Sequence, residues 1–357
     1  MYCKHSIILA ILFSIYTSLA SQEIAWKANV RSFFDNYEFS GSALTQSQTM
    51  AGVHLAPEIG LKWEKQHRIF AGLDLMREWG SERILDFCDP VIYYEYSGKP
   101  FRFYVGNIPR HMILDRYPRM FFSDSILNYR PVVNGIFWEY GQADGTYANV
   151  WLDWTGRQTR KTHESFFMGC SGRYNYGAFH LQHLGYMFHF AALKDPETDI
   201  PVHDNGLLLT SVGVNMNKRT VFTKLESSLG WVVALERDRG TNVWHTPQGI
   251  LSETTLGYKW IELSNTYYKG GKQQVFYDTF GNALYWGDPV YRSGEYDRLD
   301  MSIHFIKNEV VDIKLTYSLH FAEKNIFHQQ ALYATFNLSN LCRPDDLKTK
   351  KGTQRTP

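Results

Sequence analysis

Hydrophobic and polar positions alternate without a break between Val310 and Phe321. The apolar side chains share one face of an extended chain: Val311, Ile313, Leu315, Tyr317, Leu319 and Phe321. Because successive side chains of a strand point to opposite faces, the pattern predicts a strand with one apolar side and one polar side. A segment of this length extends roughly 40 Å, which is long for a soluble strand and sufficient for a tilted transmembrane strand.

The same alternation recurs along the chain and predicts sixteen strands, although the pattern also allows fourteen or eighteen. We place them at residues 24–34, 51–63, 68–77, 91–96, 101–107, 133–140, 146–155, 165–174, 178–190, 206–216, 219–235, 250–258, 261–268, 299–306, 310–322 and 328–338. The long eleventh strand is expected to carry a β-bulge near Ser228–Gly230. The turn at Lys259–Trp260 is the most weakly marked boundary.

The connections between these strands alternate between long and short along the chain. In a soluble sandwich, nothing requires long loops to lie at one end and short turns at the other. Transmembrane barrels have short periplasmic turns, longer extracellular loops, and strands that are apolar outside and polar inside. The sequence therefore predicts an all-β, up-and-down antiparallel transmembrane barrel.

On these features the chain resembles bacterial outer-membrane β-barrels of the porin kind. Its last predicted strand adds to the resemblance, because alternate apolar residues share one side: Leu332, Ala334, Phe336 and Leu338. In the family the closing strand usually ends the chain, whereas here a polar tail continues. The resemblance implies insertion into outer-membrane lipid by the barrel-assembly machinery and passage of small polar solutes. It identifies neither a subfamily nor a solute.

The N-terminus has the pattern of a secretory signal peptide. Lys4 precedes the apolar residues 7–15, and Ser18-Leu19-Ala20 forms a small-residue cleavage site. We expect residues 1–20 to be a cleavable signal for export to the outer membrane. Residues 21–338 are expected to form the barrel, and the polar residues 339–357 a disordered tail.

Composition narrows the class of protein further. The formal net charge is +1, which gives no reason to expect a nucleic-acid partner. Cys88, Cys170 and Cys342 are odd in number and widely spaced, so we expect no disulfide framework. They lack the spacing of a metal site, and we expect no cofactor. No apolar run near 18 residues follows the signal, so a membrane protein of this sequence must be a barrel.

The long connection at residues 108–132 is the first candidate site. It holds charged and aromatic side chains that are candidates for a pore constriction: Arg110, His111, Asp115, Arg116, Arg119, Asp124, Tyr129 and Arg130. The length of this connection favours a functional role, and its apolar content is too high for a disordered segment. The porin resemblance implies that it folds into the lumen, where opposed charges set ion selectivity. The alternative is a lid that packs at the outer mouth and only stabilises the fold.

The polar faces of the predicted strands form the second candidate site, the lining of the lumen. They carry both signs of charge: Arg31, His54, Glu58, Lys62, Arg68, Asp74, Arg102, Glu139, Asp153, Asp312, Lys314 and His320. This mixture indicates weak selectivity. Mutual salt bridging inside a plugged barrel is the alternative, because polar lumens occur in both kinds of barrel.

The long connection at residues 269–298 is a third candidate. Tyr285, Trp286, Asp288 and Tyr291 combine aromatic faces with a carboxylate, as a sugar site does. The alternative is a self-packed, Ω-like loop.

An enzyme is not expected. Outer-membrane phospholipases place a His and a Ser close together on one strand, but Asn205 stands where His203 would need a nucleophile. The predicted boundaries also leave His203 in a loop, away from any base–nucleophile pair. The expected function is a channel for passive or weakly selective passage of small polar solutes. A closed barrel acting through its loops as adhesin, receptor or assembly partner is the alternative, and a secreted β-sandwich is a third; the oligomeric state stays open.

Overall fold

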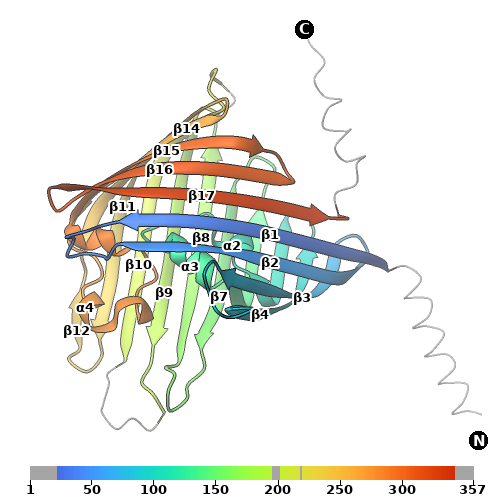
Figure 1. Ribbon diagram of the computed structural model, residues 1–357, viewed down its shortest axis with the longest axis horizontal. Coiled ribbons are helices and arrows are strands. Elements are labelled where there is room, and N and C mark those ends of the chain that lie inside the picture. Colours follow the sequence, from blue (N-terminus) through green and yellow to red (C-terminus); the bar gives the residue numbers. More distant parts are fainter. Residues whose placement is uncertain (1–21, 195–201, 218, 342–357) are drawn as a thin grey trace, which may run out of the picture.

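The computed structural model describes residues 22–194, 202–217 and 219–341, and its strands form one antiparallel sheet that closes on itself (Figure 1). Each strand pairs with its neighbours in sequence, and the closing pair is β1 with β17. The prediction of an all-β, up-and-down barrel is confirmed. The predicted signal peptide and most of the predicted tail lie outside the described residues.

Sixteen long strands of the described chain build the wall, which agrees with the predicted number. Their bounds are β1 (Glu23–Glu38), β2 (Gln48–Trp63), β3 (His67–Glu78), β4 (Phe87–Ser97), β5 (Phe101–Pro109), β6 (Val132–Gly141), β7 (Tyr147–Gly156), β8 (Ser165–Tyr176), β9 (Phe179–Phe190), β10 (His203–Asn215), β11 (Lys224–Asp238), β13 (Gln248–Tyr258), β14 (Ile261–Gly270), β15 (Glu295–Lys307), β16 (Val311–Ala322) and β17 (Asn325–Ser339). The short β12 (Val243–His245) pairs with the end of β11.

The side chains face as the alternation predicts. On β16, Leu315, Tyr317 and Phe321 are exposed on the outside, whereas Ser318 and His320 are buried. The apolar outer face suits hydrocarbon, and the pairing of strands satisfies the backbone groups that lipid leaves without partners.

Connections sort by length between the two ends of the barrel. At the short-turn end, Glu64 and Lys65 both have positive φ, which closes a tight hairpin between β2 and β3. At the long-loop end, residues 110–131 and 271–294 are the longest fully described connections. The last connection at that end, Glu323–Lys324, is an exception because it is only a tight turn.

Two predicted details are wrong. His203 lies on β10 and not in a loop, because its backbone pairs with Phe190 and Asp238 beyond the point where the apolar alternation stops. The register along β11 is continuous, so no bulge occurs near Ser228–Gly230. The register shifts lie instead between β7 and β8 and between β15 and β16.

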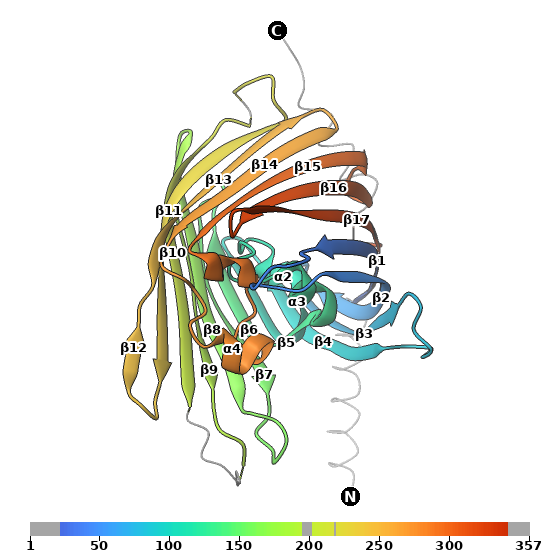
Figure 2. The ribbon, with the colours of Figure 1, turned by 60° about the vertical axis from the view of Figure 1, so that its left-hand side comes forward.

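Two long loops fold into the lumen rather than over it. The third loop, residues 110–131, carries α2 (His111–Leu114) and α3 (Asp124–Tyr129), which lie inside the ring of strands in Figure 2. The seventh loop, residues 271–294, carries α4 (Tyr277–Phe280), η1 (Gly281–Ala283) and η2 (Pro289–Ser293). None of the helices in the described ranges is long and apolar enough to cross a membrane.

The outward position of Leu315 gives a direct test of the wall. We expect Leu315→Arg to lower the free energy of unfolding by about 2–4 kcal/mol, because the charge enters hydrocarbon near the middle of the bilayer. Val310→Arg, at the exposed short-turn end, should cost about 0–1 kcal/mol. Both are measured by urea unfolding in lipid vesicles. A neutral Leu315→Arg would contradict the orientation of β16.

Candidate functional site

The third and seventh loops interlock inside the barrel. The backbone N–H of Asp288 donates to the carbonyl of Arg119 at 2.9 Å, and that of Ser123 donates to the carbonyl of Trp286 at 2.8 Å. Between these two bonds, a Cβ on Gly287 would lie 1.9 Å from the carbonyl oxygen of Met120. Only glycine permits this approach, so the two loops form one rigid body.

Aromatic packing anchors this body to the wall. Tyr117, Phe121 and Phe122 of the third loop are buried against wall residues that include Trp151 and Phe167. The indole N–H of Trp151 donates to the hydroxyl of Tyr117 at 2.8 Å. Such ring pairs contribute about 0.5–1.5 kcal/mol each beyond the area they bury. The β7–β9 side of the lumen is therefore filled.

Ion pairs fix the ends of the third loop. Arg110 lies 2.7 Å from Asp153, and both side chains are almost fully buried. The guanidinium groups of Arg110 and Arg130 lie 5.1 and 4.6 Å from the ring centre of Trp286. Further along the loop, Arg116 donates to the carboxylate of Glu139 at 2.7 Å. These contacts hold Arg110 and Arg116 in ion pairs and Arg130 against an aromatic ring.

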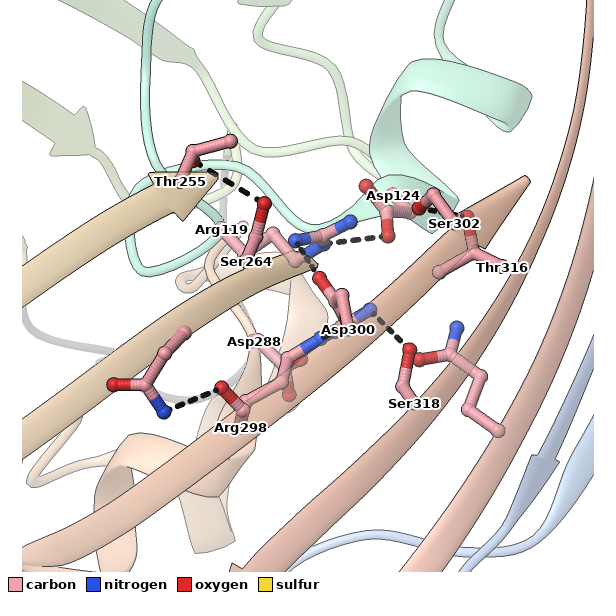
Figure 3. Close-up of polar contacts among 12 residues, drawn as sticks. Arg119, Asp124, Thr255, Ser264, Asp288, Arg298, Asp300, Ser302, Thr316 and Ser318 are labelled. Carbon is pink, nitrogen blue, oxygen red and sulfur yellow. Dashed lines mark hydrogen bonds and ion pairs between the residues drawn. The ribbon is translucent and has the colours of Figure 1, made fainter. Parts of the chain in front are cut away.

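A second ionic network joins α3 to β15 and β16 (Figure 3). Arg298 bonds Asp300 at 2.6 Å and Ser318 at 3.1 Å, and Arg119 bonds Asp124 at 2.7 Å and reaches Asp300 at 3.4 Å. Burial acts to raise the pKa of Asp124, but Arg119 and Arg298 outweigh it, and the pKa is lowered. Asp124 is therefore ionised at neutral pH.

A chain of hydrogen bonds runs across the closing strands near this network. The hydroxyl of Tyr296 contacts Nδ1 of His320 at 2.7 Å, and Nε2 of His320 contacts Oε1 of Gln329 at 3.1 Å. Nε2 of Gln329 then donates to Oδ1 of Asp35 at 2.6 Å. With the amide oxygen of Gln329 accepting from His320, its amide nitrogen must face Asp35. Asp35 is thus held in one orientation.

Asp35 faces a small cavity, the outer cavity, at the long-loop end of the lumen. Its volume is about 110 Å³, and its lining is mostly polar: Asp35, Tyr37, Thr45, Gln46, Gln48, Met50, Ser123, Asp124, Ser125, Tyr277, Asn282, Asp288, Pro289, Arg298 and Gln329. The hydroxyl of Tyr37 donates to Asp288 at 3.3 Å. Burial raises the pKa of Asp288, although Arg298 nearby acts to lower it.

A second space, the inner cavity of about 230 Å³, lies deeper along the same wall. Its lining brings together candidates from the third loop and from the strands: Arg31, His54, Glu58, Asp74, Arg110 and His111. His54 Nδ1 contacts Asp74 Oδ1 at 2.6 Å. A larger vestibule of about 750 Å³ at the short-turn end shares Asn29, Glu58, His111 and Asn337 with the inner cavity.

Phe33 lies on β1 between the two cavities. It occupies the lumen face of β1 between Arg31, which lines the inner cavity, and Asp35, which lines the outer cavity. Its ring lies edge-on to that of Tyr129, with centroids 6.2 Å apart. Tyr129 is held in turn by a hydrogen bond to Glu78.

The remaining sequence candidates are dispersed. Lys62 pairs with Glu23 at 3.1 Å, and Arg68 with Glu95 at 2.5 Å, both near the short-turn end. Asp312 there contacts His304 at 3.2 Å. The others also lie apart from the two cavities: Arg102 shares Glu139 with Arg116, Lys314 is half-buried on the lumen face of β16, and Asp115 is exposed on the third loop.

The four candidate side chains of the seventh loop pack within the protein. Tyr285, Trp286, Asp288 and Tyr291 are all buried. Tyr285 donates to the carboxylate of Glu236, and Tyr291 packs edge-on against Tyr268 and Tyr296. This geometry is that of the self-packed loop. These four side chains therefore have no exposed face that a sugar could contact. Within the described ranges, no three His, Cys, Asp or Glu side chains group closely enough to hold a metal ion.

Sequence reasoning missed Asp35, Tyr37, Arg298 and Gln329. The predicted first strand ended at Phe34, so Asp35 and Tyr37 were assigned to a loop. Continuing the alternation by four residues would have placed Phe33, Asp35 and Tyr37 on one lumen face.

Comparison with solved structures identifies the class of protein: the fold is that of bacterial outer-membrane β-barrels. A loop-deletion variant of OmpT from Vibrio cholerae is similar at a TM-score of 0.55 and 8% identity, covering 89% of this chain and 100% of that one. OccK2 from Pseudomonas aeruginosa, solved with glucuronate, is similar at 0.51 and 9% identity, covering 89% and 98%. OccK11 from the same organism is similar at 0.50 and 9% identity, covering 88% and 96%.

The family is more specific than the fold. Residues 16–343 match the model of the lipid A 3'-O-deacylase-type family, and the chain belongs to that family. A search of curated proteins found no match. The expectation that the protein is not an enzyme is wrong, because this family is named for an enzyme. Hydrolysis by water does not require neighbouring His and Ser residues on one strand.

The Arg298–Asp300 pair gives a test of the second ionic network. Arg298→Met should lower the free energy of unfolding by about 3–5 kcal/mol, because it leaves buried Asp300 with a weaker partner. The double change Arg298→Met/Asp300→Leu should recover part of that loss. Urea unfolding followed by tryptophan fluorescence measures both. Lys269→Met, in an exposed pair, is the control and should cost about 0–1 kcal/mol. A double variant no more stable than the single would contradict the prediction.

Proposed function

We propose that this protein hydrolyses an ester-linked acyl chain of a lipid A-type glycolipid at the outer cavity. Membership of the lipid A 3'-O-deacylase-type family supports the reaction and the substrate class. The observation that supports the site is the oriented carboxylate of Asp35 facing a polar cavity at the long-loop end. Ester hydrolysis by water needs a base for the water and positive charge for the oxyanion.

Asp35 is the proposed general base. Its side chain is almost fully buried, and Gln329 occupies Oδ1, so Oδ2 is the oxygen available to a water in the cavity. The hydrogen-bond chain through His320 and Tyr296 acts as positioning machinery, because it fixes the amide of Gln329 and through it the carboxylate. None of these three groups needs to touch the substrate.

Arg298 is the proposed source of positive charge for the oxyanion. It lines the same cavity and is held by Asp300 and Ser318. A guanidinium fixed in this way needs little reorganisation as the negative charge develops. Tyr37 and the serines of the third loop supply further polar groups around the reacting ester.

Removing the base tests the proposed hydrolysis. Asp35→Asn keeps the shape of the side chain but cannot accept the proton, so we expect the rate of acyl release to fall about 10²–10⁴-fold. The rate is measured by mass spectrometry of lipid A and of freed fatty acid in outer-membrane vesicles.

Asp297→Asn is the matched control, because Asp297 lies next to Arg298 on β15 and bonds Asn265 rather than lining the outer cavity. Its activity should equal that of the wild type. No acyl release from the wild type, or full activity in Asp35→Asn, would refute the proposal.

A narrow channel for small polar solutes is the second candidate function. It is favoured by the vestibule and inner cavity, which share four lining residues and lie on one side of Phe33 along β1. On this hypothesis, Phe33 and Tyr129 form the constriction between the two ends of the lumen.

Phe33→Ala/Tyr129→Ala is expected to raise the single-channel conductance in planar bilayers several-fold, because it removes both rings from the constriction. Phe34→Ala, on the outward face of β1, should leave the current unchanged. Equal currents in the double variant and in Phe34→Ala would argue against a path past these rings.

A further inference from the structure

We propose that the inner cavity is a binding site for a small oxyanion, of which hydrogen phosphate fits best, that enters from the vestibule at the short-turn end. This inference does not depend on the proposed hydrolysis, because it concerns other residues on the far side of Phe33. It rests on two unpartnered buried groups, a guanidinium that is in none of the ion pairs found in the described chain, and the volume of the cavity.

Two buried polar atoms of the cavity lining have no hydrogen-bond partner among the described residues. They are Nη1 of Arg110 and Nε2 of His54, and each side chain is only 2% exposed. A buried donor without an acceptor is unfavourable, so such groups in a native fold call for a ligand or an ordered water. Here two of them line the same space.

Two guanidinium groups, those of Arg110 and Arg31, line the cavity. Arg110 pairs with Asp153, Asp74 contacts His54, and Glu58 accepts from Tyr93. Arg31 donates to the neutral carbonyl of Leu127 at 2.7 Å, and none of the ion pairs found in the described chain includes it. The carboxylate of Asp74 acts on Arg31 without forming an ion pair with it. Two guanidinium groups in one lining, one of them outside the ion pairs found, are an arrangement that recognises phosphate or carboxylate.

Two further ionisable groups lie beside the cavity. Desolvation of His111 inside the barrel, with Arg31 and Lys27 nearby, lowers its pKa to about 4. It is therefore neutral near pH 7. Lys27 lies 3.9 Å from Glu58, so its charge meets the carboxylate already in the lining.

Hydrogen phosphate matches the two free atoms in either state of His54. Because Nδ1 faces the carboxylate of Asp74, it carries the proton, and Nε2 is an acceptor on the neutral ring and a donor on the charged ring. Hydrogen phosphate offers a hydroxyl to the first and an oxygen to the second, while Arg110 and Arg31 donate to its other oxygens. A carboxylate satisfies the same groups less completely.

The size and the route also select a small ligand. About 230 Å³ holds one oxyanion with a few waters, at roughly 30 Å³ for each water. Asn29, Glu58, His111 and Asn337 line both this cavity and the vestibule, so the ligand enters without crossing Phe33.

Isothermal titration calorimetry of the folded barrel in detergent tests the site. Inorganic phosphate, acetate and chloride are titrated separately at equal ionic strength. We expect saturable binding of one phosphate, weaker binding of acetate, and none of chloride. Phosphate binding without acetate binding assigns the site to phosphate, whereas binding of both assigns it to small oxyanions in general.

Variants distinguish this site from general attraction of anions. Arg31→Gln and, independently, His54→Gln should each weaken phosphate binding at least ten-fold. Arg173→Gln changes another lumen arginine, which is paired with Glu226 at 2.8 Å, and should bind as the wild type does. Heat-modifiable mobility on gels verifies that each variant is folded. No saturable binding above chloride, or equal losses in Arg173→Gln and Arg31→Gln, would overturn the proposal.

Discussion

Hydrogen bonding between β1 and β17 closes the sheet, and the rest of the molecule depends on this closure. An open sheet in lipid would leave two rows of backbone groups without partners, so the ends of the chain must meet. Closure also builds the outer cavity, because it brings Asp35 to within 2.6 Å of Gln329 across 294 positions of sequence. The membrane constraint on the backbone therefore creates the tertiary contact that orients a carboxylate.

The interlocked loops decide where free space remains. The third and seventh loops fill the β7–β9 side with aromatic rings, and Arg110 of the third loop is buried as a pair with Asp153, as the cost of desolvation requires. The outer cavity, inner cavity and vestibule all lie against the opposite side, along β1, β2 or β17. The side chains that line these spaces therefore come mainly from one side of the lumen.

The wall was predictable because lipid outside and polar space inside impose a two-residue period on every strand. The same period placed His320 and Arg31 on the lumen side. Their partners were not predictable. Tyr296 falls outside the predicted strands, although it holds His320, and Leu127 meets Arg31 only after the third loop folds inward. Which side chains meet inside the lumen depends on how the barrel closes and how the loops fold inward. Neither leaves a local signal in the sequence.

The mistaken expectation about catalysis has a physical origin. A side-chain nucleophile requires its base within hydrogen-bond reach, and such a pair can leave a trace as neighbouring residues on one strand. Hydrolysis by water needs only an oriented base and a charge for the oxyanion, which distant strands can supply. The groups that we propose for these roles lie on β1 and β15, with the orienting amide on β17. An inward loop that narrows the pore of one barrel can complete a cavity in another. The same porin-like architecture can therefore also hold a hydrolytic site.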